Sequence, residues 1–271
     1  MDFLKPTIGN QVKHILIILS LFLFSLTIIS CAKKSSSSSS DTTTQMGGSI
    51  QGVELSLDTV VTTLAGTGSS GSVNGTGTSA SFYNPQGITT DGTNLYVAER
   101  VNHLIRKIVI STGAVTTVAG TGSSGSANGT GTSASFNGPS GITTDGTNLY
   151  VADYDNHLIR KIVISTGAVT TVAGTGSSGS ANGTGTSTSF NFPYGITTDG
   201  TNLYVADTSN HLIRKIVIST GAVTTVAGTG SSGSANGTGT SASFSNPIRI
   251  TTDGTNLYVA DDNNHLIRKI E

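Results

Sequence analysis

Histidines and aspartates recur through this chain at one constant spacing, and both residue types could bind a metal ion. Four of the five histidines lie 54 residues apart, at His103, His157, His211 and His265. The aspartates of a repeated TDGTN sequence have the same spacing, at Asp91, Asp145, Asp199 and Asp253. Imidazole suits a transition metal, and carboxylate oxygens suit a hard cation such as Ca²⁺. Whether either set binds an ion depends on which equivalent residues the fold brings together.

The elements that must position these residues are short β-strands. One period contains four segments rich in Val, Ile, Thr and Tyr, at residues 142–144, 149–152, 158–164 and 169–173. No apolar stripe of helical period competes with this pattern. The Asp-Gly pair of TDGTN and the Gly of STGAV favour tight turns between the segments. A fixed period of 54 residues, with four antiparallel strands in each copy, predicts the blades of a β-propeller.

The sequence PSGITTDGTNLYVADYDNHLIRKI, residues 139–162, resembles an NHL repeat. The Asn-His-Leu triplet that characterises the family stands at residues 156–158 and recurs at 102–104, 210–212 and 264–266. The resemblance covers roughly residues 57–271 and implies a β-propeller. NHL propellers often have six blades, whereas this chain has four copies of the repeat. The family includes RNA-binding and protein-binding modules, cell-surface domains and a few lyases, so the fold leaves the function open.

Within such a propeller, the repeated histidines and the repeated aspartates should lie at different distances from the axis. Each histidine opens the third strand of its blade, away from the axis, so the four cannot converge on one ion. We expect each to form hydrogen bonds beside its neighbouring asparagine. The aspartates end the innermost strands and are weak candidates for an axial cation site. An Asx-type turn, in which each carboxylate bonds to its own backbone, is the favoured interpretation.

Other chemical motifs are weak. Alternation along the third strand sends Arg106 and Lys107, and their copies, to opposite faces, which favours salt-bridged or solvated side chains over a basic patch. The glycine-rich connection begins with GxGxxG at residue 120, but no helix follows, as a dinucleotide site would require. No nucleophile–base pair stands out. The sequence therefore predicts no cofactor and favours a non-enzyme, with a metal-dependent lyase or hydrolase at the axis as the alternative.

The two ends of the repeat region predict how the ring closes. Residues 57–66, LDTVVTTLAG, match the fourth strand of a repeat without the three strands before it. The chain ends at Glu271, directly after a third strand. We expect the N-terminal strand to complete the last blade, which removes two open sheet edges. This favours a closed monomer of four four-stranded blades; an eight-bladed dimer of two chains is the alternative.

The N-terminal region is typical of an exported bacterial lipoprotein. Residues 1–30 combine a basic start with an apolar run of about 15 residues, which is short for a membrane span. The sequence Ile-Ile-Ser-Cys at residues 28–31 resembles a lipobox, and Cys31 is the only cysteine of the chain. We therefore expect Cys31 to carry lipid, residues 31–50 to form a flexible Ser/Thr-rich tether, and residues 51–271 to form the propeller. The absence of an acidic residue after Cys31 favours the outer membrane of the cell envelope.

Differences between the four repeats cluster in two places that should share one face of the propeller. One place flanks the proline that precedes the first strand, and the other lies between the second and third strands. Aromatic, arginine and charged side chains at these places suit contact with a protein or a glycan. The candidate binding residues are Tyr83, Gln86, Arg100, Tyr154, Asp155, Phe192, Tyr194, Arg249 and Asp262.

Composition agrees with a binding or scaffolding role. Of the 271 residues, 35 are glycine, 11% are charged and the formal net charge is −1. A nucleic-acid-binding domain usually carries a basic face, so we expect no nucleic-acid partner. The overall hypothesis is a membrane-anchored lipoprotein that binds a protein or glycan through its variable face. A repeat-expanded surface protein with no specific partner is a further alternative.

Overall fold

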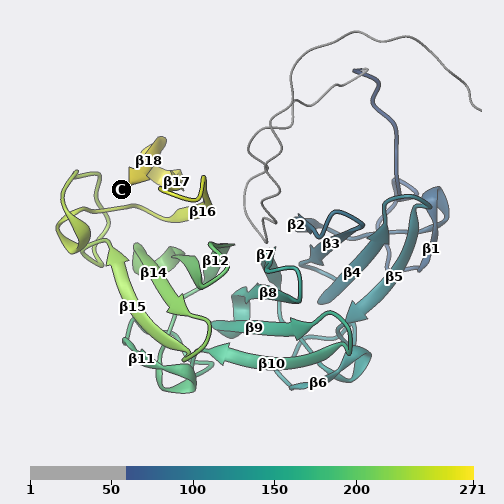
Figure 1. The fold of residues 1–271 in the computed structure, drawn as a ribbon, viewed down its shortest axis with the longest axis horizontal. Helices are drawn as coiled ribbons and strands as arrows, with labels where there is room; N and C mark the ends of the chain where they lie inside the picture. Colours follow the sequence, from purple (N-terminus) through teal and green to yellow (C-terminus); the bar gives the residue numbers. More distant parts are fainter. Residues whose placement is uncertain (1–58) are drawn as a thin grey trace, which may run out of the picture. The chain divides into compact units, whose positions relative to one another are not determined.

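The computed structural model describes residues 59–271, and these residues form an all-β propeller of four antiparallel sheets (Figure 1). The predicted signal peptide, Cys31 and the tether lie outside the described residues. None of the described residues belongs to a helix of the length and apolarity needed to cross a membrane.

Each of the first three blades contains the four strands that the repeat predicts. Blade 1 contains β2 (Pro85–Thr90), β3 (Asn94–Glu99), β4 (Leu104–Val109) and β5 (Ala114–Ala119). Blade 2 contains β7 (Pro139–Thr144), β8 (Asn148–Asp153), β9 (Leu158–Val163) and β10 (Ala168–Ala173). Blade 3 contains β12 (Pro193–Thr198), β13 (Asn202–Asp207), β14 (Leu212–Val217) and β15 (Ala222–Ala227). In each blade the first strand lies innermost, and the strands follow one another outward.

The glycine-rich connections add a short fifth strand at the outer edge of these three sheets. These strands are β1 (Gly75–Thr76), β6 (Gly129–Thr130) and β11 (Gly183–Thr184), which pair with β5, β10 and β15. A 3₁₀ turn follows at each equivalent position, namely η1 (Gly77–Ser79), η2 (Gly131–Ser133), η4 (Gly185–Ser187) and η6 (Gly239–Ser241). Each connection therefore belongs to the blade that comes after it. The loop that the sequence predicts here forms this edge strand and turn.

Further 3₁₀ turns join the second and third strands in blades 2 to 4. They are η3 (Tyr154–Asn156), η5 (Thr208–Asn210) and η7 (Asp262–Asn264). Each turn ends at a histidine in the left-handed conformation, with φ between 56° and 57°. This conformation, uncommon for a residue with a side chain, reverses the chain into the third strand.

The core lies between the blades, because neighbouring sheets pack face to face and the two central sheets are covered on both faces. Inner strand β2 packs on β7, β7 packs on β12, and β12 packs on the first strand of blade 4. One apolar cluster, for example, joins Tyr96 and Ile105 of blade 1 to Phe136, Ile142 and Val151 of blade 2. This explains why the middle strands are apolar on both faces.

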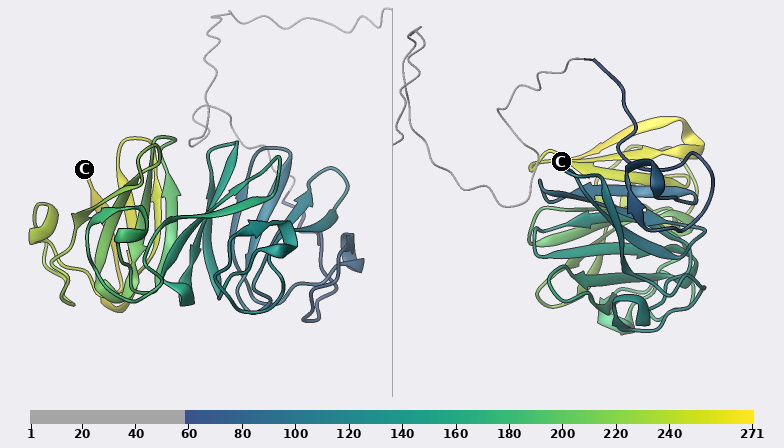
Figure 2. Two further views of the ribbon diagram at one scale, coloured as in Figure 1. Left: turned by 90° about the horizontal axis from the view of Figure 1, so that it is seen from below. Right: turned by 90° about the vertical axis from the view of Figure 1, so that its right-hand side faces the viewer.

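The last blade differs from the prediction. Its sheet contains only β16 (Pro247–Thr252), β17 (Leu257–Asp261) and β18 (Leu266–Ile270). Residues 59–66 form no strand, and Val61 is 97% exposed. The four-bladed all-β propeller is confirmed, but the expected closing strand is wrong for the described part of the segment. Blades 1 and 4 share no strand, so the ring of blades is not closed by strand pairing in this structure (Figures 1 and 2).

Candidate functional site

The residues predicted for the variable face meet in an aromatic and cationic cluster. Tyr154 of η3 lies at its centre, with its ring centroid 4.9 Å from that of Phe192 and 5.4 Å from that of Tyr194. The guanidinium of Arg100 lies 4.6 Å from the Tyr154 ring centroid. Such pairs combine edge-to-face and cation–π attraction. Blades 1, 2 and 3 each contribute a side chain to this half of the cluster.

The second half of the cluster joins blade 3 to blade 1 and to blade 4. The guanidinium of Arg249, on β16, lies 4.8 Å from the Tyr194 ring centroid. Arg249 Nη2 also donates a hydrogen bond of 2.8 Å to the carbonyl oxygen of Gln86, and the Tyr194 hydroxyl bonds to the Gln86 side-chain oxygen. We name Gln86, Arg100, Tyr154, Phe192, Tyr194 and Arg249 the variable-face cluster.

Three histidines link adjacent blades, and one of them, His157, contacts the cluster. His157 Nδ1 accepts a 3.0 Å hydrogen bond from the Phe192 amide, and the two rings lie 4.6 Å apart. The equivalent bonds run from the Gly138 amide to His103 and from the Asn246 amide to His211. Burial lowers the pKa of His103 and His157, although nearby Asp155 opposes this effect. The hydrogen-bonding role expected from the sequence is confirmed for these three histidines, with a partner that lies in the next blade.

Two candidate residues lie outside the cluster. Tyr83 is exposed, and its amide donates to the carboxylate of Glu99. Asp262 is exposed on η7, where its carbonyl accepts from the His265 amide. Asp155 adjoins the cluster, since its carboxylate acts on both His103 and His157.

The turn aspartates bond within their own turns. Asp145 Oδ1 accepts from the amides of Thr147 and Asn148, and Oδ2 accepts from the Asn148 side chain and the Tyr150 hydroxyl. These hydrogen bonds outweigh the effect of burial and lower the pKa of Asp145. Within residues 59–271, no three His, Cys, Asp or Glu side chains gather as metal ligands. The geometry therefore matches the favoured Asx-type turn.

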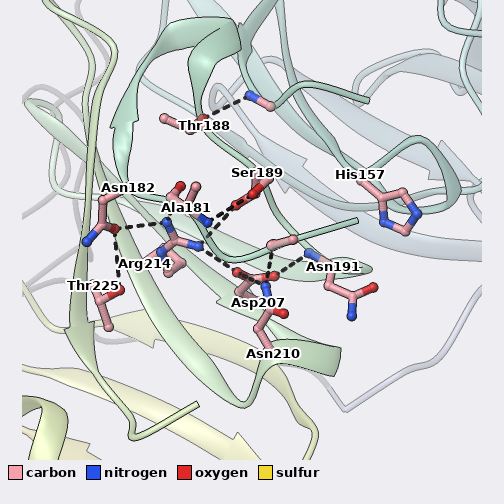
Figure 3. A network of polar contacts seen from close by, with 12 residues as sticks. His157, Ala181, Asn182, Thr188, Ser189, Asn191, Asp207, Asn210, Arg214 and Thr225 are labelled. Atoms are coloured by element: carbon pink, nitrogen blue, oxygen red, sulfur yellow. Dashed lines mark hydrogen bonds and ion pairs between the residues drawn. The ribbon is translucent and has the colours of Figure 1, made fainter. Parts of the chain in front are cut away.

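A buried ion pair repeats in every blade, and sequence reasoning did not foresee its burial. In blade 3, Arg214 Nη1 lies 2.8 Å from Asp207 Oδ2, and both side chains are inaccessible to solvent (Figure 3). Nη2 donates to the Ala181 carbonyl and to Asn182 Oδ1, while Asp207 also accepts from the Asn210 side chain. The equivalent pairs are Arg106–Glu99, Arg160–Asp153 and Arg268–Asp261. The sequence did contain a signal for this ion pair. Each arginine follows an acidic residue by seven positions, across the turn between adjacent strands.

These arginines tie each glycine-rich connection to its blade. Arg160 donates to the carbonyls of Ser135 and Ala127, both in the connection that precedes blade 2. Its guanidinium also lies 5.2 Å from the Phe136 ring centroid. The arginine thus has a structural role, whereas the variable-face cluster is half-buried and exposes Arg249.

Comparison with known proteins agrees with this architecture. The NHL repeat family matches residues 136–162. Protein SUPPRESSOR OF QUENCHING 1, chloroplastic, from Arabidopsis thaliana is 33% identical over 65% of this chain and 18% of its own length. NHL repeat-containing protein 2 from Bos taurus is 31% identical over 53% of this chain and 22% of its own length. The chain thus spans about a fifth of the length of these relatives.

A solved structure of similar fold is an auxiliary nutrient binding protein from Bacteroides thetaiotaomicron. It superposes with a TM-score of 0.55 at 21% identity, over 68% of this chain and 47% of that protein. At this identity the likeness concerns the fold alone. The chain therefore forms a four-bladed β-propeller, and one of its four repeats, at residues 136–162, matches the NHL repeat family.

Proposed function

We propose that this propeller is a binding module and that the variable-face cluster is its contact surface. The observation that carries the proposal is the convergence of Arg100, Tyr154, Phe192, Tyr194 and Arg249 from four blades. Each blade has the same scaffold, so a scaffold role alone would not require these differences. Tyrosine and arginine are also the residues that dominate protein–protein binding energy.

The arrangement of the cluster favours a protein partner over a glycan. A sugar ring stacks on an open aromatic face, but Arg100 covers a face of Tyr154 and Arg249 covers a face of Tyr194. The guanidinium groups retain donors for carboxylates or carbonyls of a partner. Among proteins of similar fold, one is described as a nutrient binding protein, which supports a binding role in general terms.

The proposed setting is the bacterial cell envelope. The sequence of residues 1–30 supports export as a lipoprotein, Cys31 would carry the lipid, and residues 31–50 would hold the propeller away from the membrane. Several acyl chains on one residue anchor firmly, because each buried CH₂ contributes about 0.8 kcal/mol. Metabolic labelling with an alkyne fatty acid tests this. We expect label and membrane association to be lost in Cys31→Ser; persistence of both would refute the anchor.

Affinity capture with matched baits tests the binding surface. The full chain carrying Cys31→Ser is the reference bait, and the test bait adds Tyr154→Ser, Tyr194→Ser and Arg249→Ser. The control bait instead adds Thr147→Ser, Thr201→Ser and Thr255→Ser in the TDGTN turns. We expect a partner that binds the reference and control baits and is lost from the test bait, with thermal unfolding used to confirm that all three fold. Identical captures from all three baits would refute the proposed surface.

A further inference from the structure

Blade 4 has an open slot at the position where blades 1 to 3 carry their fourth strand. In blade 2, β10 lies between β9 and β6. The equivalent space in blade 4 lies between β18 and residues 236–239, and is a cavity of about 540 Å³. Its lining includes Phe244, Ile267 and Ile270. Ile267 is 77% exposed, whereas the equivalent Ile159 is fully buried.

The described chain also contains one unpaired segment that matches this slot. Residues 60–65 read VVTTLA, and the strand that fills the slot in blades 1 to 3 reads AVTTVA. Val61 is almost fully exposed, whereas its equivalents Val115, Val169 and Val223 are buried. A β-rich segment and an open sheet edge of matching sequence are mutually complementary.

Arg249 occupies a position that is glycine in the other blades, and we infer that it keeps residues 60–65 away from the slot beside β18 in the same chain. The equivalent positions in blades 1 to 3 are Gly87, Gly141 and Gly195. There a Cβ atom would lie 2.2, 2.4 and 2.7 Å from a carbonyl oxygen of the next blade. The side chain of Arg249 therefore holds blade 1 away from blade 4, and its guanidinium meets the corresponding carbonyl, that of Gln86.

The segment is attached to blade 1 at its other end. The Gly66 amide donates to the Gly77 carbonyl at 3.0 Å, as the Gly120 amide does to Gly131 in the next blade. Residues 60–65 consequently stay beside blade 1 while the slot stays beside blade 4. Because the two sites are held apart in one chain, a second chain can satisfy both.

We propose that residues 60–65 of one copy insert as the fourth strand of blade 4 in a second copy. By the register of β10 on β9, Thr62 lies opposite Lys269 and Thr63 lies opposite Arg268. The Thr63 hydroxyl then reaches Asn236, as Thr171 reaches Asn128 in blade 2. Reciprocal exchange gives a closed dimer, whereas one-way donation gives a longer assembly.

Cysteine cross-linking between differently labelled chains tests this exchange. All chains are full length and carry Cys31→Ser, so that only the added cysteines react. One chain carries Thr62→Cys and the other carries Lys269→Cys; directly opposed positions in a sheet are close enough for a disulfide after small adjustments. We expect a linked heterodimer on mixing and mild oxidation. The matched control replaces Thr62→Cys with Thr116→Cys, which is already paired within blade 1, and should yield no heterodimer.

A chain carrying both Thr62→Cys and Lys269→Cys distinguishes exchange from closure within one molecule. Exchange predicts linked dimers or longer species from this chain. A cross-linked monomer would overturn the proposal, and so would the absence of any cross-link in both experiments. Sedimentation of the Cys31→Ser chain provides a second readout: Val61→Asp should shift the assembly to monomer, whereas a mass unaffected by this change would also refute the exchange.

Discussion

Arg249 on β16 donates a hydrogen bond to the carbonyl oxygen of Gln86 on β2, although 163 residues separate the two along the chain. This contact joins the first blade to the last at the variable face. In the other three blades the equivalent position is glycine, and the next blade packs directly against it. Arg249 is therefore part of the candidate binding cluster, and we infer that its Cβ atom prevents blade 1 from packing on blade 4 as the other blades pack on one another.

Replacing Arg249 with glycine should let blade 1 approach blade 4. Arg249→Gly removes the Cβ atom that the carbonyl of Gln86 would otherwise meet, whereas Arg249→Ala retains it. We expect amide hydrogen exchange in β2 and β18 to slow in Arg249→Gly and not in Arg249→Ala. Strand exchange between two copies should weaken at the same time, since a strand of the same chain has the higher effective concentration at the slot. Equal amide hydrogen-exchange rates in the two variants would contradict this role for the Cβ atom.

Removing one buried arginine should destabilise the propeller more at neutral than at acidic pH. Burial raises the pKa of Asp153 to about 6, against the opposing effects of Asn156 and Arg160. Arg160→Met leaves this carboxylate without its cation, which costs about 3–5 kcal/mol for a buried pair. A folded-state pKa above the unfolded value favours folding at low pH, and this benefit is lost as the pH rises through the folded-state pKa.

Urea unfolding of Arg160→Met at pH 5 and pH 8 measures this effect. The loss of unfolding free energy, relative to the parent chain, should be larger at pH 8. The half-buried neighbour Lys161 supplies the control, because Lys161→Met should change the unfolding free energy by about 0.5 kcal/mol or less. A deficit that is equal at both pH values would contradict the uncompensated charge as its cause.

The histidine links between blades should weaken in acid. Burial lowers the pKa of His157, and a protonated Nδ1 could not accept the hydrogen bond from Phe192. The unfolded chain protonates its histidines near pH 6.5. Stability from this residue is therefore complete above that pH and falls as the pH decreases below it.

Urea titrations between pH 7 and pH 5 should show a smaller decrease in unfolding free energy for His157→Gln than for the parent chain. Because His157 is partly exposed, solvent screening should keep the difference below about 1 kcal/mol. His265 is the matched control, since within residues 59–271 its ring accepts no amide from a following blade. A flattened slope in His265→Gln as well would argue against the link between blades.

The turn aspartates should contribute stability that disappears at low pH. Burial tends to raise the pKa of Asp91, but hydrogen bonds from Asn94, Thr93 and Tyr96 prevail and lower it to about 2. A lowered folded-state pKa stabilises the fold above the unfolded pKa near 3.9, and this stability is lost as the pH falls toward 2.

Asp91→Asn keeps an acceptor oxygen and removes the charge. Because Asp91 is only half-buried, we expect a loss of about 0.5 kcal/mol at pH 7 after solvent screening. Urea unfolding at pH 7 and pH 2.5 should show the difference shrinking toward zero at the lower pH. A difference that persists unchanged at pH 2.5 would mean that hydrogen-bond geometry, and not charge, accounts for the loss.

Much of the candidate site could be predicted by comparing the four repeats with one another. The positions that differ identified six residues that the fold brings together, because the proline-flanking loop and the turn before the third strand lie on one face. Tyr83 and Asp262 share these positions but lie outside the cluster, at the surface of blades 1 and 4. The buried arginines went unrecognised as core residues because their charge predicts a solvated side chain, and only the enclosing carbonyl and carboxylate groups permit their burial.

By itself, the amino-acid sequence determined the period, the strands, the turns and the all-β blades, since these depend on local propensity and on contacts that repeat every 54 residues. Only the tertiary structure decided how the ends of the propeller meet. The fit of blade 1 against blade 4 depends on a close approach between residues distant in the chain, and at position 249 arginine replaces the glycine that permits this approach in the other blades. The tertiary structure likewise turned separate histidines into links between blades, because each Nδ1 receives its proton donor from the following blade.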